Sequence, residues 1–358
     1  MKIFVSVLGQ VDNVGDTVLR RAYLDALRPA GQLQVYVGER DSSYLSGLGL
    51  AETDVLVRSR SQWRRAISRA SLREASVYAF NAGEMEVRRT YAMQYVRLAP
   101  LLAGLRLRGG HVIHAGFGVR RPTGWRIPIA LTLRMADIVS WRDTESRAAM
   151  GLGRVAPDWA FAAGSPDVEL AGNDDARQQL AVSIRYNGKR PDATWVQSVS
   201  ALADALGLSI VVVAQILRDG PLATELAGEL GGEAAVWEGP DHATQEEKLR
   251  SVYRRSRILV TNRLHAAVMA LTEGALPLAL GDPSRNSAGS PDVPDKVTRT
   301  LAAAGITGVT VDEGLPDAAA LERTAREVLG RRDTILQHVV DARHTLDRLT
   351  ADMRRLTG

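Results

Sequence analysis

The chain has 358 residues, 45% of them hydrophobic, which is enough for two domains with apolar cores. It contains no cysteine, which excludes disulfides, thiolate metal sites and a cysteine nucleophile. The 45 basic and 41 acidic residues give a net charge of +4, which favours an anionic partner slightly. Because the basic residues look interspersed with acidic ones and only 5% of residues are aromatic, we expect no nucleic-acid partner. The run over residues 58–73, which contains Trp63, could form a basic surface, but such a run is most often a solvated helix. The sequence shows no secretory leader and no bilayer-spanning apolar run, so we predict a soluble, cytoplasmic protein.

The first half of the chain alternates apolar runs with helical segments. Residues 2–8 (KIFVSVL) are expected to form a strand, followed by a glycine-containing loop over 9–16 and a helix over 17–27. Further strands are predicted at 33–37, 77–80, 111–115 and 138–141, the third of these stopping at Gly116-Phe117-Gly118. A loop rich in Gly, Asn or charge follows each strand, which is typical of an open, doubly wound sheet with its site along one edge.

Three residues of the first loop are candidates for a ligand site. Asn13 offers an amide, Gly15 permits the close approach of a ligand, and Asp16 could cap the following helix or act as a base. The loop is neither a dinucleotide fingerprint nor a P-loop, because it lacks both G-x-G-x-x-G and the G-K-[ST] ending.

Charged residues also follow later strands of this half. Glu84 lies in the loop after the strand at 77–80, and Arg142 and Asp143 stand at the carboxyl end of the strand at 138–141. Since the carboxyl ends of parallel strands share one edge, we expect these residues near the site. Asp143 and the later Asp158 are each more typical of carboxylates that cap a helix or hold a loop.

The second half restarts after a polar, glycine-rich linker over 163–179, which places two domains at residues 1–165 and 180–330. Strands are predicted at 181–184, ending at Arg185, and at 208–215 and 234–237, with helices at 192–206, 222–230 and 244–256. The loop 282–289 has the composition of a lid, and Lys296 opens the next helix.

The most informative stretch is residues 257–282, RILVTNRLHAAVMALTEGALPLALGD. It predicts a buried strand, a helix capped by Thr261 or Asn262, a glycine C-cap at Gly274 and a second buried strand, which together form a βαβ unit. Arg263 and His265 then fall in the first helical turn, where the helix N-terminus faces the crevice that binds anions. The structural alternative is that Arg263 caps a carbonyl and His265 is a satisfied core histidine.

The C-terminal segment, residues 331–358, is predicted to be an amphipathic helix. Its apolar residues are spaced four and three apart, as in a packed helix. They are Ile335, Val339, Ala342, Leu346, Leu349, Met353 and Leu356. This seam either packs back across the two domains, which we favour, or pairs with another subunit.

Together these pieces resemble the polysaccharide pyruvyl transferase family, over a span from Gly9 to about Thr300. The resemblance rests on the N-terminal loop, the segment from Gly116 to Gly118, and Arg142, Asp143, Ser146, Asp158 and Arg185, and above all on Arg263-Leu264-His265. Members transfer the pyruvyl unit of phosphoenolpyruvate onto two sugar hydroxyls as a cyclic ketal, and share a two-domain fold with GT-B glycosyltransferases. The resemblance therefore implies phosphoenolpyruvate as donor substrate, a glycan or lipid-linked oligosaccharide as acceptor, and no cofactor. Peripheral association with a membrane and an oligomeric state are compatible with it.

Ketal formation needs an acid, a base and several cations, which assigns provisional roles to these residues. The catalytic candidates are His265 as acid and Asp16 and Asp143 as bases. The donor-binding candidates are Arg263, Leu264, His265, Arg185, Lys296 and Arg142, and the acceptor-side candidates are Asn13, Gly15, Asp16 and Glu84. No spacing of histidines and carboxylates indicates a metal site, so we predict none.

Two other functions stay open at this stage. A GT-B glycosyltransferase or another nucleotide-sugar enzyme would use the same fold, and would rely on a carboxylate such as Glu273 to hold the ribose. A catalytically silent protein could keep the anion pocket as a sensor or scaffold. Anion binding without turnover of any acceptor would identify this catalytically silent protein.

Overall fold

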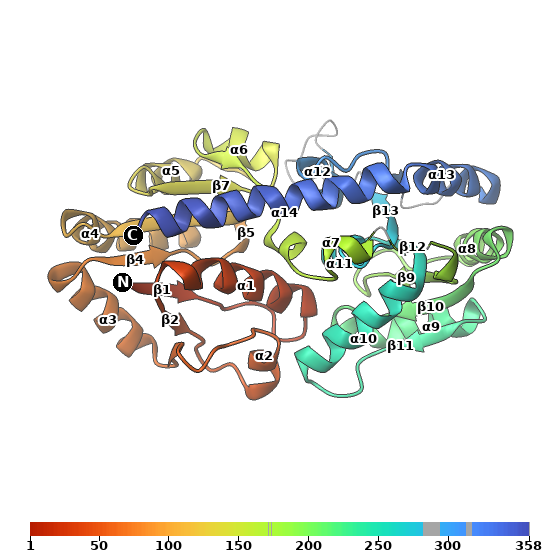
Figure 1. Ribbon diagram of the computed structural model, residues 1–358, viewed down its shortest axis with the longest axis horizontal. Coiled ribbons are helices and arrows are strands. Elements are labelled where there is room, and N and C mark those ends of the chain that lie inside the picture. The colour runs from red at the N-terminus through yellow and green to blue at the C-terminus, as the bar shows by residue number, and fades with distance from the viewer. Residues whose placement is uncertain (171, 173, 282–293, 313–316, 358) are drawn as a thin grey trace.

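Two parallel β-sheets, each covered by helices, make up the chain in this computed structural model (Figure 1). The structure describes residues 1–170, 172, 174–281, 294–312 and 317–357. The predicted architecture of two doubly wound α/β halves is confirmed, because every strand pair within the two sheets is parallel. The predicted lid at 282–289 lies outside the described residues.

The N-terminal sheet has the strand order β3-β2-β1-β4-β6-β7-β8, and β5 pairs with β6. Its strands are β1 (Lys2–Ser6), β2 (Gln32–Tyr36), β3 (Val55–Val57), β4 (Ser76–Ala79), β5 (Gly83–Glu86), β6 (His111–Arg120), β7 (Ile138–Trp141) and β8 (Arg154–Val155). Its helices are α1 (Val14–Leu27), α2 (Ser42–Ser46), α3 (Arg60–Arg73), α4 (Arg89–Leu107), α5 (Arg126–Leu133) and α6 (Thr144–Met150), with short 3₁₀ turns η1 (Arg28–Ala30) and η2 (Trp159–Ala162).

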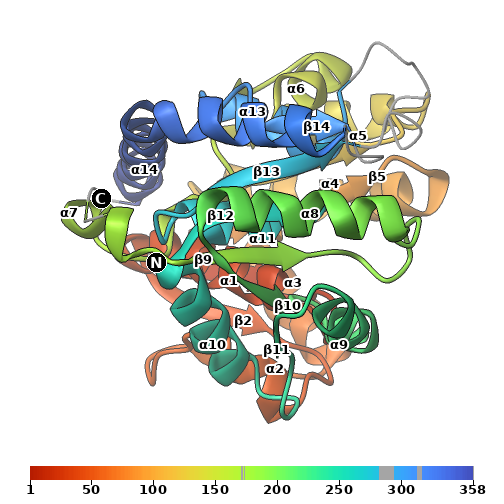
Figure 2. The same cartoon turned by 90° about the vertical axis from the view of Figure 1, so that its right-hand side faces the viewer.

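The C-terminal sheet has the order β11-β10-β9-β12-β13-β14. Its strands are β9 (Gln179–Ser183), β10 (Ser209–Val213), β11 (Glu233–Ala235), β12 (Ser256–Thr261), β13 (Leu276–Gly281) and β14 (Thr310–Asp312). The helices of this half are α8 (Ala193–Leu206), α9 (Gly220–Glu229), α10 (His242–Arg255), α11 (Leu264–Leu271), α12 (Lys296–Ala303) and α13 (Ala318–Gly330), with the turn η4 (Leu217–Asp219). Figure 2 shows this half toward the viewer, with α8 and α13 side by side. The expected linker holds α7 (Asp167–Leu170) and the turn η3 (Asp174–Ala176).

The alternating side chains of β1 show how the N-terminal sheet is covered. Phe4 packs in a core shared with α3, α4 and α5, whereas Ile3 and Val5 point to the opposite face, toward α1. The core that contains Ile3 and Val5, between β1 and α1, is continuous with the core of the C-terminal half, because it also contains the buried residues of β9, β12 and α11. The two halves therefore share one apolar core on the α1 side.

Helix α14 (Arg332–Arg355) ties the two halves together along this side (Figure 1). It runs from α13 in the C-terminal half back over α1, and the predicted seam faces inward: its members from Ile335 to Met353 are buried. Arg343 donates hydrogen bonds to the carbonyls of Phe161, Ala163 and Ser165, which lie between the halves.

Two predicted boundaries are wrong in ways that affect the site. Strand β6 does not stop at the glycines but continues through Gly116 and Gly118 to Arg120. Helix α1 begins at Val14, and its N-cap is Asn13 rather than Asp16, because the Asn13 side chain accepts a hydrogen bond from the Gly15 N–H. Asn and Asp are both good N-cap residues, so the sequence was compatible with either Asn13 or Asp16 as the N-cap.

Candidate functional site

The loop before α1 is fastened to the C-terminal half by backbone and side-chain hydrogen bonds. The Leu217 N–H donates to the Asp12 carbonyl at 2.8 Å, and the Gln215 amide donates to Asn13 Oδ1 at 2.8 Å. His242 Nε2 lies 2.8 Å from the Val11 carbonyl. The carboxyl end of β1 and the N-terminus of α1 are thereby held against the second sheet.

Gly15 has a different role from the one predicted. A Cβ atom at this position would lie 2.4 Å from His265 Cβ and 2.6 Å from the Gln215 amide nitrogen. Gly15 therefore permits the close approach of the two halves rather than of a ligand, and it does not line the cavity described below.

The predicted βαβ unit is present as β12, α11 and β13, but its helix starts one residue later than expected. Arg263 is the N-cap of α11, and Thr261 Oγ1 accepts a hydrogen bond from the Arg263 N–H. The Arg263 guanidinium donates to Asp219 at the end of η4. Asn262 Oδ1 accepts from the Arg185 N–H at 2.9 Å, which joins β9 to the same turn.

A cavity of about 470 Å³ lies between the two halves, at the carboxyl ends of β1 and β12. This volume is within the usual range of about 300–1,000 Å³ for small-molecule sites. Its lining residues are Leu8, Gly9, Gln10, Asn13, Asp16, Leu19, Arg20, Arg40, Gly83, Glu84, Arg142, Ile216, Arg263, His265 and Lys296. Five of these are basic and two acidic, so the lining has an excess of three positive charges before His265 is counted.

Ion pairs connect the cavity's carboxylates with its cations. Arg20 Nη1 lies 3.2 Å from Asp16, and Glu84 lies 3.3 Å from Arg142 and 3.4 Å from Lys296. Burial opposes the charge of Glu84, but Lys296, Arg142 and other cations lower the pKa of Glu84 to about 2. Burial likewise opposes the charge of Asp16, whose pKa is nevertheless below its ordinary value because of Arg20 and the Gln10 N–H. Both carboxylates are therefore ionised at neutral pH.

Burial lowers the pKa of the Lys296 ammonium, and the charge of Arg142 adds to this effect, while Glu84 and Asp16 oppose it. An ammonium among guanidinium groups is the cation here that most readily loses its proton.

His265 projects into the cavity from the first turn of α11. Its side chain is buried, and Nε2 has no hydrogen-bond partner among the described residues. Nε2 lies 3.8 Å from Asp158 Oδ2, which is beyond hydrogen-bond distance but close enough for charge to act. Burial opposes ionisation of Asp158, but His265 and Arg142 hold the pKa of Asp158 well below its usual range. His265 therefore has an ionised carboxylate close to its Nε2.

The structure brings together most of the predicted site residues, but not all of them. Asn13, Asp16, Glu84, Arg142, Arg263, His265 and Lys296 line the cavity. Asp143 does not: it is fully buried, caps α6 by accepting from the Ser146 N–H, and lies 3.6 Å from Arg299. Leu264 is buried in the apolar core, and Arg185 lies behind the turn that carries Arg263.

Two cations of the cavity, Arg20 and Arg40, were not predicted. Arg40 follows the carboxyl end of β2, so the rule applied to the other strands would have found it. Arg20 lies one helical turn after Asp16, a spacing that indicates an ion pair. No group of three or more His, Asp or Glu able to hold a metal ion occurs in the described part of the chain. No described helix is long and apolar enough to cross a membrane.

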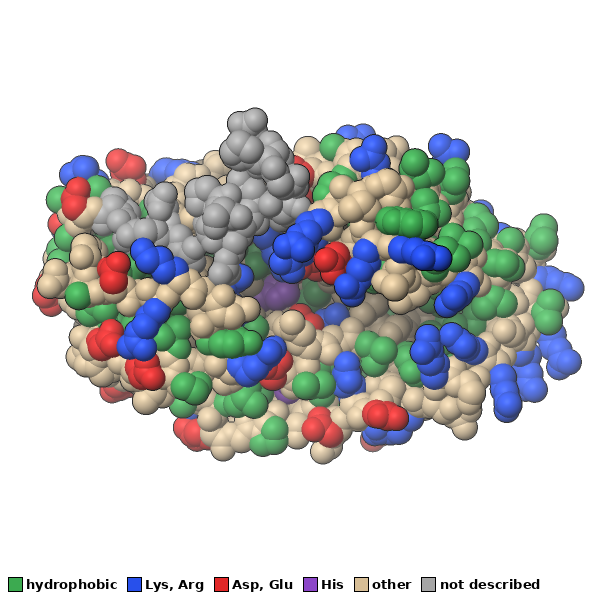
Figure 3. Space-filling view, turned by 180° about the vertical axis from the view of Figure 1, so that it is seen from behind, with side chains coloured by type: hydrophobic (Ala, Val, Ile, Leu, Met, Phe, Trp, Pro, Cys, Tyr) green, Lys and Arg blue, Asp and Glu red, His purple; other side chains and the backbone are tan. Residues whose placement is uncertain are grey.

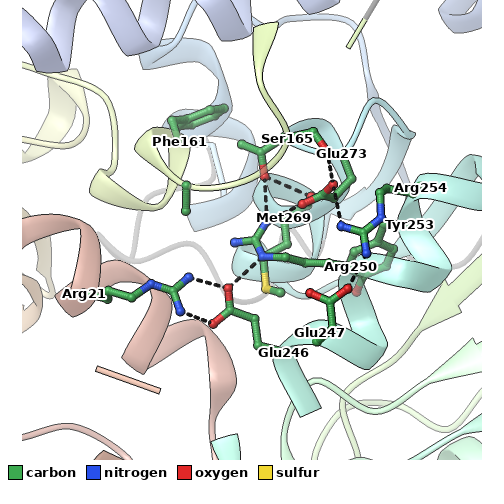
Figure 4. Close-up of polar contacts among 12 residues, drawn as sticks. Arg21, Phe161, Ser165, Glu246, Glu247, Arg250, Tyr253, Arg254, Met269 and Glu273 are labelled. Atoms are coloured by element: carbon green, nitrogen blue, oxygen red, sulfur yellow. Dashed lines mark hydrogen bonds and ion pairs between the residues drawn. The ribbon is translucent and has the colours of Figure 1, made fainter. Parts of the chain in front are cut away.

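Glu273, the carboxylate that a nucleotide-sugar enzyme would need, belongs to a buried ion network (Figure 4). Arg250 donates to Glu273 at 2.6 Å and to Glu246 at 2.7 Å, and the Ser165 hydroxyl donates to Glu273 at 2.6 Å. Arg21 of α1 donates to Glu246 from the other half. Glu273 is 1% exposed, so it is not available to a ligand in the cavity.

The fold and the cleft between the halves define a protein of the GT-B class. Three solved structures with this fold resemble the chain. A protein from Listeria monocytogenes described as a UDP-N-acetylglucosamine 2-epimerase has a TM-score of 0.59 at 12% identity, with 99% of this chain and 95% of that chain covered. The glycotransferase of kitacinnamycin gives 0.54 at 12% identity, covering 99% and 96%. An E. coli structure described as trehalose-6-phosphate bound with UDP-2-fluoro glucose gives 0.53 at 11% identity, covering 99% of both chains. These identities show the fold alone.

Comparison of the sequence with models of protein families identifies the family of the chain. The model of the family "Polysaccharide pyruvyl transferase" matches residues 13–275, and the chain belongs to this family of enzymes. No curated protein matches the chain.

Proposed function

We propose that the protein transfers the pyruvyl group of phosphoenolpyruvate to two hydroxyls of a glycan and forms a cyclic ketal. The observation that carries this proposal is His265, which lines a cavity rich in cations and has the ionised Asp158 3.8 Å from its Nε2. An imidazole is the side chain best suited to give up a proton near neutral pH. The family to which the chain belongs supports the same activity.

The charge of the cavity suits this donor. Phosphoenolpyruvate carries a phosphate and a carboxylate, with nearly three negative charges in total. The lining has an excess of three positive charges, which Asp158 and Asp219 offset in part because they pair with Arg142 and Arg263. Arg263 stands at the N-terminus of α11, where the helix dipole and free N–H groups add to its attraction for an anion. We assign the donor's phosphate or carboxylate to this end, with Arg20, Arg40, Arg142 and Lys296 completing the charge balance.

The reaction requires few groups beyond these. His265 gives a proton to the methylene carbon of the donor, which becomes a methyl group and leaves an oxocarbenium-like carbon. One acceptor hydroxyl then attacks that carbon, the C–O bond to phosphate breaks, and a second hydroxyl closes the ring. Of the two hydroxyl protons, one restores His265 and the other leaves with phosphate, so the sum balances. The cations stabilise the departing phosphate.

Removal of the protons from the acceptor hydroxyls is better assigned to groups other than the carboxylates of the cavity. Asp16 and Glu84 have lowered pKa values, which makes them weak bases. We assign Asp16 and Glu84 to orienting the acceptor hydroxyls by accepting their hydrogen bonds. Proton removal then falls to His265, once it has given up its own proton, for one hydroxyl and to the departing phosphate for the other.

Sugar-nucleotide transfer is the second candidate, since the GT-B fold supports it. The network around Glu273 disfavours it, because the carboxylate expected to hold a ribose is buried and bonded to Arg250 and Ser165. This leaves pyruvyl transfer as the better-supported function.

A thermal-shift titration of the purified protein tests the proposal. We expect saturable stabilisation by phosphoenolpyruvate, about 2.7 kcal/mol at 100 times Kd, and less by inorganic phosphate. Arg263→Ala should abolish it, whereas His265→Gln should retain donor binding but lose phosphate release in the presence of glycan acceptors. Stabilisation by UDP- or ADP-sugars without any response to phosphoenolpyruvate would instead identify a glycosyltransferase.

A further inference from the structure

Three helices on the outer face of the N-terminal sheet contain no acidic residue. They are α3, α4 and α5, which pack side by side over one face of the sheet. Residues 58–134, which include them, hold 15 arginines, three glutamates and no lysine or aspartate, an excess of 12 positive charges. The whole chain has an excess of only four. The expectation that basic and acidic residues are interspersed is therefore wrong for this segment.

The arginines of α3 are exposed and uncompensated. They are Arg60, Arg64, Arg65, Arg69 and Arg73. None of them has an ion pair with another described residue, and three pairs among them are four residues apart, where like charges repel. Folding gains nothing from this arrangement, so a repeated positive charge on one helix face points to an external anion.

Large apolar side chains are exposed on the same three helices and the loop before α5. They are Leu72, Val96, Leu107, Trp125, Ile127 and Leu131, and Leu107 is 86% exposed. Figure 3 shows hydrophobic and basic side chains together at the far right-hand end of the molecule, which is the N-terminal half, with no acidic side chain visible there. Arginines together with exposed aliphatic side chains match the boundary of a bilayer, where phosphate headgroups and acyl chains meet.

We propose that this surface, formed by α3, α4 and α5 and called here the basic face, docks on a membrane that contains anionic lipids. Arginines bind the lipid phosphates, while Trp125, Ile127 and Leu131 enter the boundary between headgroups and acyl chains. A nucleic acid would use the same charge. Single strands, however, are bound by stacking aromatic side chains, of which this face exposes one, Trp125, and a duplex is bound through its phosphates, which leaves the exposed aliphatic side chains without a partner. This attachment is peripheral, because it uses side chains exposed on the outside of folded helices.

The basic face adjoins the cavity. The Thr123 hydroxyl, two residues before Trp125, donates to the Val87 carbonyl at 2.7 Å, next to the end of β5. Strand β5 carries Glu84, which lines the cavity, and pairs with β6 up to Arg120. A protein docked by this face would hold the Glu84 side of its cavity near the lipid surface. If the proposed function holds, the acceptor is a glycan carried on a membrane lipid.

Vesicle flotation with the full-length protein tests the proposal. We expect binding to vesicles of phosphatidylcholine with phosphatidylglycerol, no binding to phosphatidylcholine alone, and loss of binding at high salt. The triple variant Arg64→Glu, Arg65→Glu, Arg69→Glu should bind at least about 100-fold more weakly, since each arginine near an anionic surface contributes about fivefold. The matched control Arg323→Glu, Arg348→Glu, Arg354→Glu changes three exposed arginines of α13 and α14 and should bind like the parent.

A second variant separates membrane docking from simple attraction to polyanions. Ile127→Ser, Leu131→Ser should weaken vesicle binding and leave the affinity for duplex DNA unchanged, with Val168→Ser as the control at an exposed apolar site elsewhere. Equal binding of the parent to neutral and anionic vesicles, or full binding by the Arg64, Arg65, Arg69 variant, would overturn the proposal. So would unaltered vesicle binding by the Ile127, Leu131 variant, which would identify a polyanion site. Thermal stabilisation by phosphoenolpyruvate should persist in all of these variants. If the parent protein itself shows no such stabilisation, that result would count against pyruvyl transfer but not against membrane docking.

Discussion

Gly15 and His265 belong to different halves of the chain, yet they are in direct contact. The missing side chain of Gly15 leaves the space that His265 Cβ and Nδ1 occupy, since a Cβ on Gly15 would lie 2.4 and 2.5 Å from these atoms. Asn13 holds the same turn by accepting from the Gly15 N–H and from the Gln215 amide. The position of the proposed acid thus depends on the first turn of α1.

Gly15→Ala should therefore reduce turnover more than it reduces stability. The added methyl must displace His265 or part the two halves, at a cost of about 1–3 kcal/mol, and a displacement of about 1 Å at a reacting group costs about 100-fold in rate. Kinetics and a denaturation curve measure the two effects. Gly228→Ala in α9, where a Cβ meets nothing within 4 Å, is the control and should be neutral or slightly stabilising. Full activity in Gly15→Ala would show that His265 needs no such placement.

Arg263→Lys should weaken phosphoenolpyruvate binding about tenfold with little change in stability. One edge of the guanidinium is bonded to Asp219, and only a planar fork can hold that carboxylate and a donor anion at once. Isothermal titration with phosphoenolpyruvate measures the change. Arg190→Lys, an exposed arginine paired with Glu225 and Glu229, serves as the control. If both variants bind the donor like the parent, Arg263 is not a donor ligand.

Glu84→Gln should lower stability at neutral pH, and the difference from the parent should vanish in acid. The folded-state pKa of Glu84 is about 2, against an ordinary value of 4.5, so its ionisation stabilises the fold above pH 4.5. This stabilisation is at most about 3 kcal/mol and is lost as the pH falls from 4.5 to 2. Urea denaturation of both proteins at pH 7, 4 and 2.5 measures it. A constant difference across this range would mean that the Glu84 charge is not what holds Arg142 and Lys296.

The predictions from sequence succeeded where the residues that define a feature are neighbours along the chain. The βαβ unit around His265 was visible because an apolar run, two cap residues and an apolar helix follow one another directly. The same holds for Arg142, which directly follows β7, since strand ends meet at one edge of a parallel sheet whatever the rest of the fold does. Glu84 also lines the cavity, but it lies in the short strand β5 rather than in the predicted loop.

The failures concern contacts between distant segments. Nothing near Gly15 in the sequence reveals a histidine 250 positions later, and no local signal separates Asp143, a buried helix cap, from Asp16, which reaches the cavity. The basic face was recognised only in part. The run over residues 58–73 stands out as a candidate basic surface, whereas the later arginines look dispersed until three helices bring them to one side of a sheet. Counting charge by segment would have shown it.

Glu273→Gln should destabilise the protein by about 3 kcal/mol without changing its affinity for phosphoenolpyruvate. The substitution leaves Arg250 with Glu246 as its remaining carboxylate in a buried site, and breaking such a pair typically costs about 3–5 kcal/mol. Chemical denaturation and donor titration give the two quantities. Glu247→Gln alters an exposed pair with Arg254 and should change stability by less than about 1 kcal/mol. Donor affinity that falls together with stability would place Glu273 in the site after all.

Leu346→Ala should destabilise the protein by about 2–4 kcal/mol and make unfolding of the two halves less cooperative. Leu346 is buried in the seam of α14, a helix that also reaches both halves through Arg154 with Asp352 and through Arg332 with the Gly274 carbonyl. Asp347→Ala alters the next, exposed residue and should have little effect. Calorimetry reports both the melting temperature and the number of transitions. An unchanged transition, combined with a change in the sedimentation coefficient, would instead mean that the seam's main partner is a second copy of the chain.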